Sequence, residues 1–63
     1  MTMKTNDERI GKRGTAKVTW TNGRVTESEG TILAIDEQAG EVYLDTVIGA
    51  VVGDLDTLEV DDD

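Results

Sequence analysis

Three acidic residues near the C-terminus have the spacing closest to that of a metal-binding loop. Asp54, Asp56 and Glu59 occur in the sequence DLDTLE, which resembles the start of a calcium-binding loop. Such a loop continues with a third acidic position, a glycine and a distant glutamate, none of which follows here. Alternation along a strand would place Asp54 and Asp56 on one solvent-exposed face. The sequence therefore predicts surface acids, with no bound metal and no cofactor.

Residues that could carry out catalysis are few. The chain contains no histidine, which removes the commonest general base, and no cysteine, which excludes disulfides and zinc sites built from thiolates. Ser28 is the only serine, and no histidine is present to activate it. Lys12 and Lys17 have the chemistry to form a Schiff base, but a chain of 63 residues leaves little room for a pocket that excludes water. We therefore predict that the protein is not an enzyme.

Four basic residues are candidates for contacting the phosphates of a nucleic acid. Lys17 and Arg24 flank a predicted hairpin, and Lys12 and Arg13 precede it, so the four side chains could form a cationic strip. The alternative interpretation is that they neutralise acidic surface of the protein itself or of a neighbouring molecule. In molar salt counterion release contributes little to nucleic-acid binding, so binding through charge alone would be weak. Both interpretations stay open.

Trp20 and Tyr43 are the only aromatic residues. An exposed aromatic side chain on a small barrel can stack on a nucleic-acid base, which contributes about 1–3 kcal/mol per base. Trp20 shares the face of Ala16 and Val18, so we place it at the centre of the core. Tyr43 lies opposite the apolar residues on either side of it. We expect Tyr43 to be exposed, as a stacking residue or an interface anchor.

The charge is distributed very unevenly along the chain. The first 24 residues hold all six basic residues and two acids, a formal charge of +4, whereas the other 39 hold twelve acids and no base, a charge of −12. The whole chain therefore carries −8. At about 1 M ionic strength the Debye length is about 3 Å, so most of the internal repulsion is screened. This composition resembles that of proteins from extreme halophiles, especially haloarchaea.

Elements with the period of a strand must position these residues. TAKVTWT (residues 15–21) and the run from Arg24 alternate, and Asn22-Gly23 between them predicts a hairpin with a type I′ turn, which needs positive φ at both residues. The returning strand reaches Gly30, where a glycine permits a bend or a bulge. Further short runs of strand character follow, at residues 31–36, 41–46, 47–53 and 54–60.

The inward residues of the later strands follow from the same alternation. In TILAID (residues 31–36) we place Ile32 and Ala34 on one face and Leu33 and Ile35 on the other. In EVYLDT (residues 41–46) we place Val42 and Leu44 together on the inside, and EQAG (residues 37–40) is a predicted turn. Four or five strands without proline predict an all-β fold that closes into a small barrel or pairs its edges with another copy.

The predicted domain organisation has three parts. Residues 1–14 form a flexible, weakly basic arm, residues 15–60 form the barrel, and residues 61–63 form an acidic tail. The chain has no secretory signal segment and no run of about 18 apolar residues. We therefore expect a cytoplasmic protein that does not contact a membrane.

Residues 18–45, VTWTNGRVTESEGTILAIDEQAGEVYLD, resemble the first motif of the Sm-like family. Glycines and an aspartate recur in the family's order, and Asp36 follows Gly30 by six residues. The later IGAVVGDLDTLEV (residues 48–60), with Gly49 and Gly53, is faintly similar to the second motif of the family, so the resemblance covers about 40 residues in all. It implies a small SH3-like or Sm-like barrel that assembles with other copies and binds RNA. The chain departs from the family at Gly40, where an asparagine is usual, and it has no Arg-Gly pair in the second motif.

A shorter stretch, KVTWTNGRVT (residues 17–26), resembles the start of swapped-hairpin DNA-binding proteins of the AbrB and antitoxin type. About ten residues are similar, and the resemblance implies a dimer that contacts DNA through the hairpin. The Ile-Pro and the arginine-bearing helix that continue that family are absent, because ESEGTILAID follows instead.

The functional prediction is a small binding or assembly module of a halophile, with RNA binding of the Sm-like kind. The alternatives are a dimeric swapped-hairpin regulator that binds DNA and an acidic module that binds a protein partner, and a homo-oligomer is among the predicted states. If nucleic acid is the partner, the predicted contact residues are Lys12, Arg13, Lys17, Arg24 and Tyr43.

Overall fold

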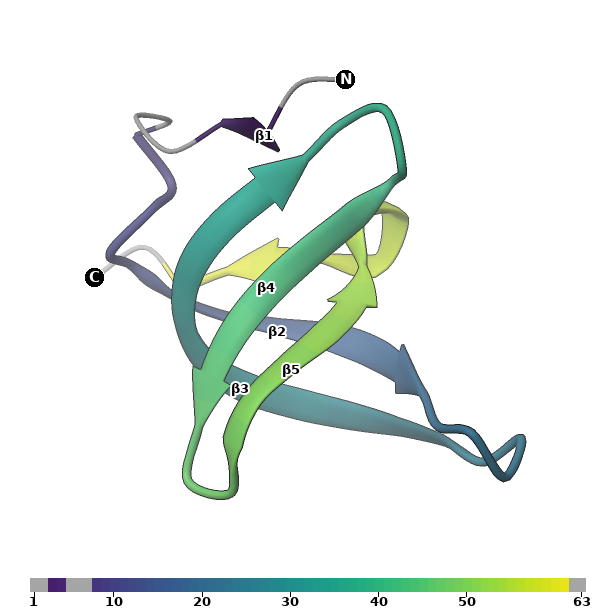
Figure 1. The fold of residues 1–63 in the computed structure, drawn as a ribbon. Helices are drawn as coiled ribbons and strands as arrows, with labels where there is room; N and C mark the ends of the chain where they lie inside the picture. The colour runs from purple at the N-terminus through teal and green to yellow at the C-terminus, as the bar shows by residue number, and fades with distance from the viewer. Residues whose placement is uncertain (1–2, 5–7, 62–63) are drawn as a thin grey trace.

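A computed structural model describes residues 3–4 and 8–61, which form one antiparallel sheet curled into a barrel-like fold (Figure 1). The elements are β1 (Met3–Lys4), β2 (Arg13–Thr19), β3 (Val25–Asp36), β4 (Glu41–Thr46), β5 (Gly49–Asp54), the 3₁₀ turn η1 (Leu55–Thr57) and β6 (Glu59–Val60). The sheet has the strand order β5-β4-β3-β2-β6, and β1 pairs separately with β3. The predicted small all-β fold is confirmed.

The hairpin between β2 and β3 forms at the predicted Asn22-Gly23, but its turn is of a different type. Gly23 has φ +85°, whereas no residue other than glycine has positive φ in the described parts, so Asn22 cannot fit a type I′ turn. The backbone N–H of Gly23 donates to Trp20 O at 2.9 Å, and that of Trp20 donates to Arg24 O at 2.8 Å. The connection is therefore a three-residue loop that ends in a left-handed glycine, and our two-residue prediction was wrong.

A register shift in β3 changes which of its residues point inward. The pairing with β4 is regular at Ile32, breaks between Ile32 and Ala34, and resumes beyond. Leu33 is the extra residue of this bulge and is 44% exposed, whereas Ile35 is fully buried beside Ile32. Our predictions that Ile32 and Ala34 share one face and that Leu33 and Ile35 share the other were both wrong, because one inserted residue reverses the alternation.

Gly30 is required for close packing. A side-chain carbon at this position would lie 2.8 Å from the carbonyl carbon of Asp45, which belongs to the backbone of β4. The sequence predicts a bend or bulge here. The register shift instead lies at Leu33, and Gly30 remains regularly paired with Gly14 of β2. Figure 1 shows β3 as a strongly curved strand that passes from β2 to β4.

The core lies between the inner faces of the curled sheet. Its largest fully buried side chains include Val42 and Leu44 of β4, as predicted. Trp20 is not at its centre: it is half-buried and packs against the edge of the core, and its indole N–H donates to Thr26 Oγ1 at 2.7 Å. The buried apolar residues are Ala16, Val18, Ile32, Ile35, Val42, Leu44 and Val51.

Two strands that share no ladder complete the barrel-like shape. A side-chain carbon at Gly53 of β5 would lie 3.0 Å from Ala16 Cβ and 3.2 Å from Lys17 O, both in β2. The absence of a side chain therefore lets β5 lie close against β2. After β5, η1 turns the chain so that β6 pairs with the first residues of β2.

The segment predicted as a flexible arm is partly bound to β3. Met3 and Lys4 pair with Asp36 and Ile35, and the backbone N–H of Gly11 donates to Ile32 O at 2.9 Å. The strand expected from Thr15 begins at Arg13. Residues 1–2 and 5–7 of the predicted arm and residues 62–63 of the predicted tail lie outside the described residues. Within the described ranges no helix is long and apolar enough to span a membrane.

Candidate functional site

The outer face of the β2–β3 ribbon carries cations and carboxylates side by side. Lys17 lies directly opposite Glu27 in the register, and Arg13 Nε is 3.9 Å from Glu29 Oε2. All four side chains are exposed. Pairs of this kind contribute about 0–1 kcal/mol to stability, but each places a carboxylate beside a cation that we predicted to contact phosphate. The predicted cationic strip is therefore interleaved with acids.

The five predicted contact residues do not form one cluster. Lys12 and Arg13 lie at the start of β2 and Arg24 lies beyond its other end, in the hairpin, so that a seven-residue strand of roughly 23 Å separates them. Tyr43 lies on β4, which pairs with β3 and β5 and not with β2. Of the five, only Arg13 and Lys17 share the outward face of a strand.

Tyr43 is half-buried, between Ala34 of β3 and Val52 of β5, whereas the sequence predicts an exposed side chain. Its hydroxyl donates to Glu41 Oε1 at 3.3 Å. Desolvation raises the pKa of the Tyr43 hydroxyl above its ordinary value, and the negative charge of Glu41, the hydrogen bond to it and the charge of Asp36 raise the pKa further. Its surroundings are therefore acidic, which opposes the approach of phosphate.

We expect Glu41→Gln to lower the pKa of Tyr43, because glutamine still accepts the hydrogen bond but carries no charge. Ultraviolet titration of tyrosinate measures this directly, since Tyr43 is the only tyrosine. In the wild type the folded state holds its proton at a pH where the unfolded state has lost it, so stability falls as the pH rises above about 10. Glu27→Gln, on the other ribbon, is the control. Equal midpoints of the tyrosinate titration in the wild type and in Glu41→Gln would show that the charge of Glu41 does not raise the pKa of Tyr43.

The outer face of β4 and β5 has a different chemistry, and we call it the acidic face. It presents Glu41, Tyr43 and Asp45 from β4 and Ala50, Val52 and Asp54 from β5. Glu41 lies directly opposite Asp54, and like charges in this arrangement destabilise a sheet. At the other end, Asp45 lies opposite Ala50. Carboxylates thus bracket a centre formed by the phenol of Tyr43 and Val52.

A depression of about 290 Å³ lies where the acidic face meets β2. Lys17 is the only cation among the described residues that line it, and it reaches this place because β5 lies against β2. The lining combines a cation, two carboxylates and an apolar side chain, which can contact a polar ligand from several sides. The lining residues are Lys17, Thr19, Glu41, Val52, Gly53 and Asp54.

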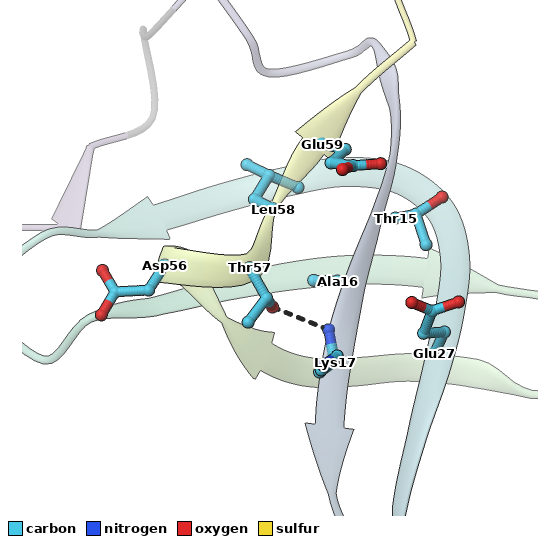
Figure 2. Close-up of a pocket in the computed structure, with 8 residues that line it drawn as sticks. All are labelled: Thr15, Ala16, Lys17, Glu27, Asp56, Thr57, Leu58 and Glu59. Atoms are coloured by element: carbon cyan, nitrogen blue, oxygen red, sulfur yellow. Dashed lines mark hydrogen bonds between the residues drawn. The ribbon is translucent and has the colours of Figure 1, made fainter.

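A second depression of about 430 Å³ lies between β2 and η1, and it has a structural explanation (Figure 2). Thr57 Oγ1 accepts from the backbone N–H of Lys17 at 2.9 Å and donates to Asp54 O at 2.8 Å. The hydroxyl therefore ties the 3₁₀ turn to β2. In Figure 2 Asp56 points away from Lys17. Asp54 and Asp56 are both exposed, but Asp56 belongs to η1, so strand alternation does not place it as we predicted.

The described part of the chain contains no group of three or more residues that could hold a metal ion. Sequence reasoning also missed the most exposed apolar residues. Val47 and Ile48 form the turn between β4 and β5 and are 103% and 75% exposed, and Val52 is 41% exposed. The sequence did carry a signal for a turn, because a glycine, Gly49, directly follows this dipeptide, and in the structure it has φ +115°.

Comparison of the chain with protein-family models, with curated proteins and with solved structures finds no match. The resemblances to the Sm-like family and to swapped-hairpin proteins therefore stay predictions.

Proposed function

We propose that the protein is a small, non-enzymatic binding module that holds a cationic segment of a protein partner on its acidic face. The observation that carries this proposal is the distribution of charge between the two outer faces. On the β2–β3 ribbon each cation has a carboxylate beside it, at Arg13–Glu29 and at Lys17–Glu27. The β4–β5 pair contains no cationic residue, and Lys17 of β2, which lines the depression with Glu41 and Asp54, is the one cation among the described residues that line it.

A cationic partner would relieve a repulsion that the fold itself creates. Glu41 and Asp54 face each other across the ladder, and a lysine or arginine placed between them would interact favourably with both. Tyr43 and Val52, between the carboxylates, offer apolar area for the partner's side-chain stem. The arrangement of an apolar centre with a charged rim is typical of a protein-binding surface.

The same arrangement makes a protein partner a better candidate than a nucleic acid. A base stacked on Tyr43 would bring its phosphates close to Glu41, Asp45 and Asp54. The cations predicted to contact phosphate lie on β2 and in the hairpin, where Glu27 and Glu29 compete for them. In the molar salt that the composition suggests, the counterion contribution to binding RNA or DNA is also small.

The proposal predicts that the acidic face, and not total charge, determines affinity. A short peptide of alternating lysine and valine is titrated into the protein at about 0.2 M KCl by isothermal titration calorimetry. We expect the double variant Glu41→Gln/Asp54→Asn to bind roughly 5- to 30-fold more weakly, because each lost charge contact contributes about 0.5–1 kcal/mol.

The matched control is Glu27→Gln/Glu29→Gln, which removes the same charge from the β2–β3 ribbon. Its affinity for the peptide should stay within about twofold of that of the wild type. An equal loss in both variants would show a non-specific charge effect and overturn the proposal. Tighter binding of a single-stranded oligonucleotide, lost on Arg24→Glu, would favour the nucleic-acid alternative instead.

A further inference from the structure

One strand edge of the sheet is open, and the hydrogen-bond pattern identifies its free groups. The backbone N–H of Leu55 donates to Gly40 O at 2.9 Å, and the register places Glu41 opposite Asp54. In an antiparallel ladder bonded and non-bonded pairs alternate, so Val51 bonds to β4 whereas Ala50 and Val52 do not. The backbone N–H and C=O groups of Ala50 and Val52 therefore point away from β4.

Nothing in the described part of the chain pairs with these groups. β2 touches β5 at Gly53 without forming a ladder, and Asp54 O is occupied by the hydroxyl of Thr57. β6 pairs with Gly14 and Thr15 at the start of β2 and does not reach β5. Among residues 3–4 and 8–61, the outer edge of β5 is thus a row of unpaired donors and acceptors.

A second open edge, on β3, is protected in a way that the β5 edge is not. Between Val25 and Glu29 the side of β3 that faces away from β2 has no partner strand among the described residues, but Glu27 and Glu29 project from it. Charged side chains discourage the addition of another strand. Along β5 the corresponding positions are Ala50 and Val52, beside the exposed turn at Val47 and Ile48.

We infer that β5 binds an extended, basic segment of a protein partner as an added strand, an inference that rests on the proposed function and specifies its geometry. Strand addition would supply backbone hydrogen bonds to Ala50 and Val52. The outward side chains of the added strand would lie beside Val52 and Asp54, and Glu41 would lie one strand further, about 4.8 Å away. Alternating basic and apolar residues therefore complement this edge.

Charge distinguishes this partner from a second copy of the chain. Each copy carries a net charge of −8, and pairing of two β5 edges would bring two acidic faces together. Strand addition would also permit binding in molar salt, where a Debye length of about 3 Å leaves only short-range charge contacts. Backbone hydrogen bonds and contact with Val52 do not depend on long-range attraction.

Amide hydrogen exchange measured by NMR tests the added strand in the unmodified protein. In the free protein we expect the Ala50 and Val52 amides to exchange quickly and the Val51 amide slowly. The lysine–valine peptide should slow exchange at Ala50 and Val52 by at least about tenfold. The same peptide with every backbone amide N-methylated keeps its carbonyl acceptors, but its methyl groups block close approach to a strand edge and it cannot donate to the C=O groups of Ala50 and Val52. It should therefore give no such protection.

Val52→Pro removes one outward N–H without removing a bond to β4, and proline is tolerated at such edge positions. It should weaken peptide binding at least about tenfold, whereas Val25→Pro, on the open edge of β3, should leave it within about twofold. Peptide binding without protection of Ala50 and Val52 would overturn strand addition and leave the proposed function standing. No peptide binding at all would overturn both strand addition and the proposed function. Protection of the Ala50 and Val52 amides that rises with protein concentration in the absence of peptide would overturn the inferred partner, because a second copy of the chain would then occupy the edge.

Discussion

Replacing Ile35 by alanine is expected to lower the free energy of unfolding by about 2–5 kcal/mol, whereas Leu33→Ala should lower it by less than about 1 kcal/mol. Ile35 is fully buried and Leu33 is 44% exposed, although the two residues lie two positions apart in one strand. In a regular strand they would share a face and their substitutions would have similar costs. The difference between the two losses of unfolding free energy therefore tests whether β3 is bulged between Ile32 and Ala34.

Urea unfolding followed by the fluorescence of Trp20, the only tryptophan, gives both free energies. A domain of 63 residues is expected to be stable by only about 3–9 kcal/mol, so the measurements are made in about 2 M KCl, which screens the repulsion within a chain of net charge −8. Val42→Ala, at a buried position where no bulge intervenes, is the positive control. Similar losses for Leu33→Ala and Ile35→Ala would contradict the register shift.

Strand identity and fold class could be predicted because they depend on local alternation. Ala16 and Val18 of β2 and Val42 and Leu44 of β4 point inward as the period of two requires. The bulge at Leu33 could not be predicted in this way, since both faces of TILAID carry apolar residues. A strand that is apolar on both sides gives no signal of which residue is inserted, and the choice is made by its pairing with β4.

The outcome for the cations shows how strongly a site depends on register. A two-residue Asn22-Gly23 turn would have placed Lys17 opposite Ser28 and left Glu27 on the face of Val18. The three-residue loop shifts the pairing by one, so that Lys17 lies opposite Glu27 and both are outside. The acids at Glu27 and Glu29 could have indicated this register, because the register set by a two-residue turn would bury both carboxylates in the core.

The open edge of β5 could not be predicted from local sequence at all. VIGAVVG is apolar and would suit a buried strand equally well. Only the strand order shows that β5 ends the sheet, and only the contact at Gly53 shows that β2 lies against it without pairing. Edges are properties of topology, and for this reason the surface that we infer to bind a partner was absent from the sequence prediction.

The second large effect is expected at Gly30, where any side chain should be destabilising. A β-carbon there meets the backbone carbonyl of Asp45, which cannot rotate away as a side chain would. Gly30→Ala must therefore separate β3 from β4 next to the Thr31–Asp45 pair, and we expect a loss of about 3 kcal/mol. Because Asp45 belongs to the acidic face, the same variant should also weaken binding of the basic peptide.

Gly23 provides the contrast, because its requirement is conformational and not steric. Its φ is +85°, and no atom lies within 4 Å of the place that a β-carbon would occupy. Gly23→Ala should cost about 1–2 kcal/mol, and Gly23→Asn should cost less, since asparagine adopts left-handed backbone more readily. At Gly30 asparagine should be no better than alanine, because the cost there comes from the β-carbon that both share. Urea unfolding of the four variants checks this, and a gain from asparagine at Gly30 would show that the close approach of β3 and β4 is not what requires glycine.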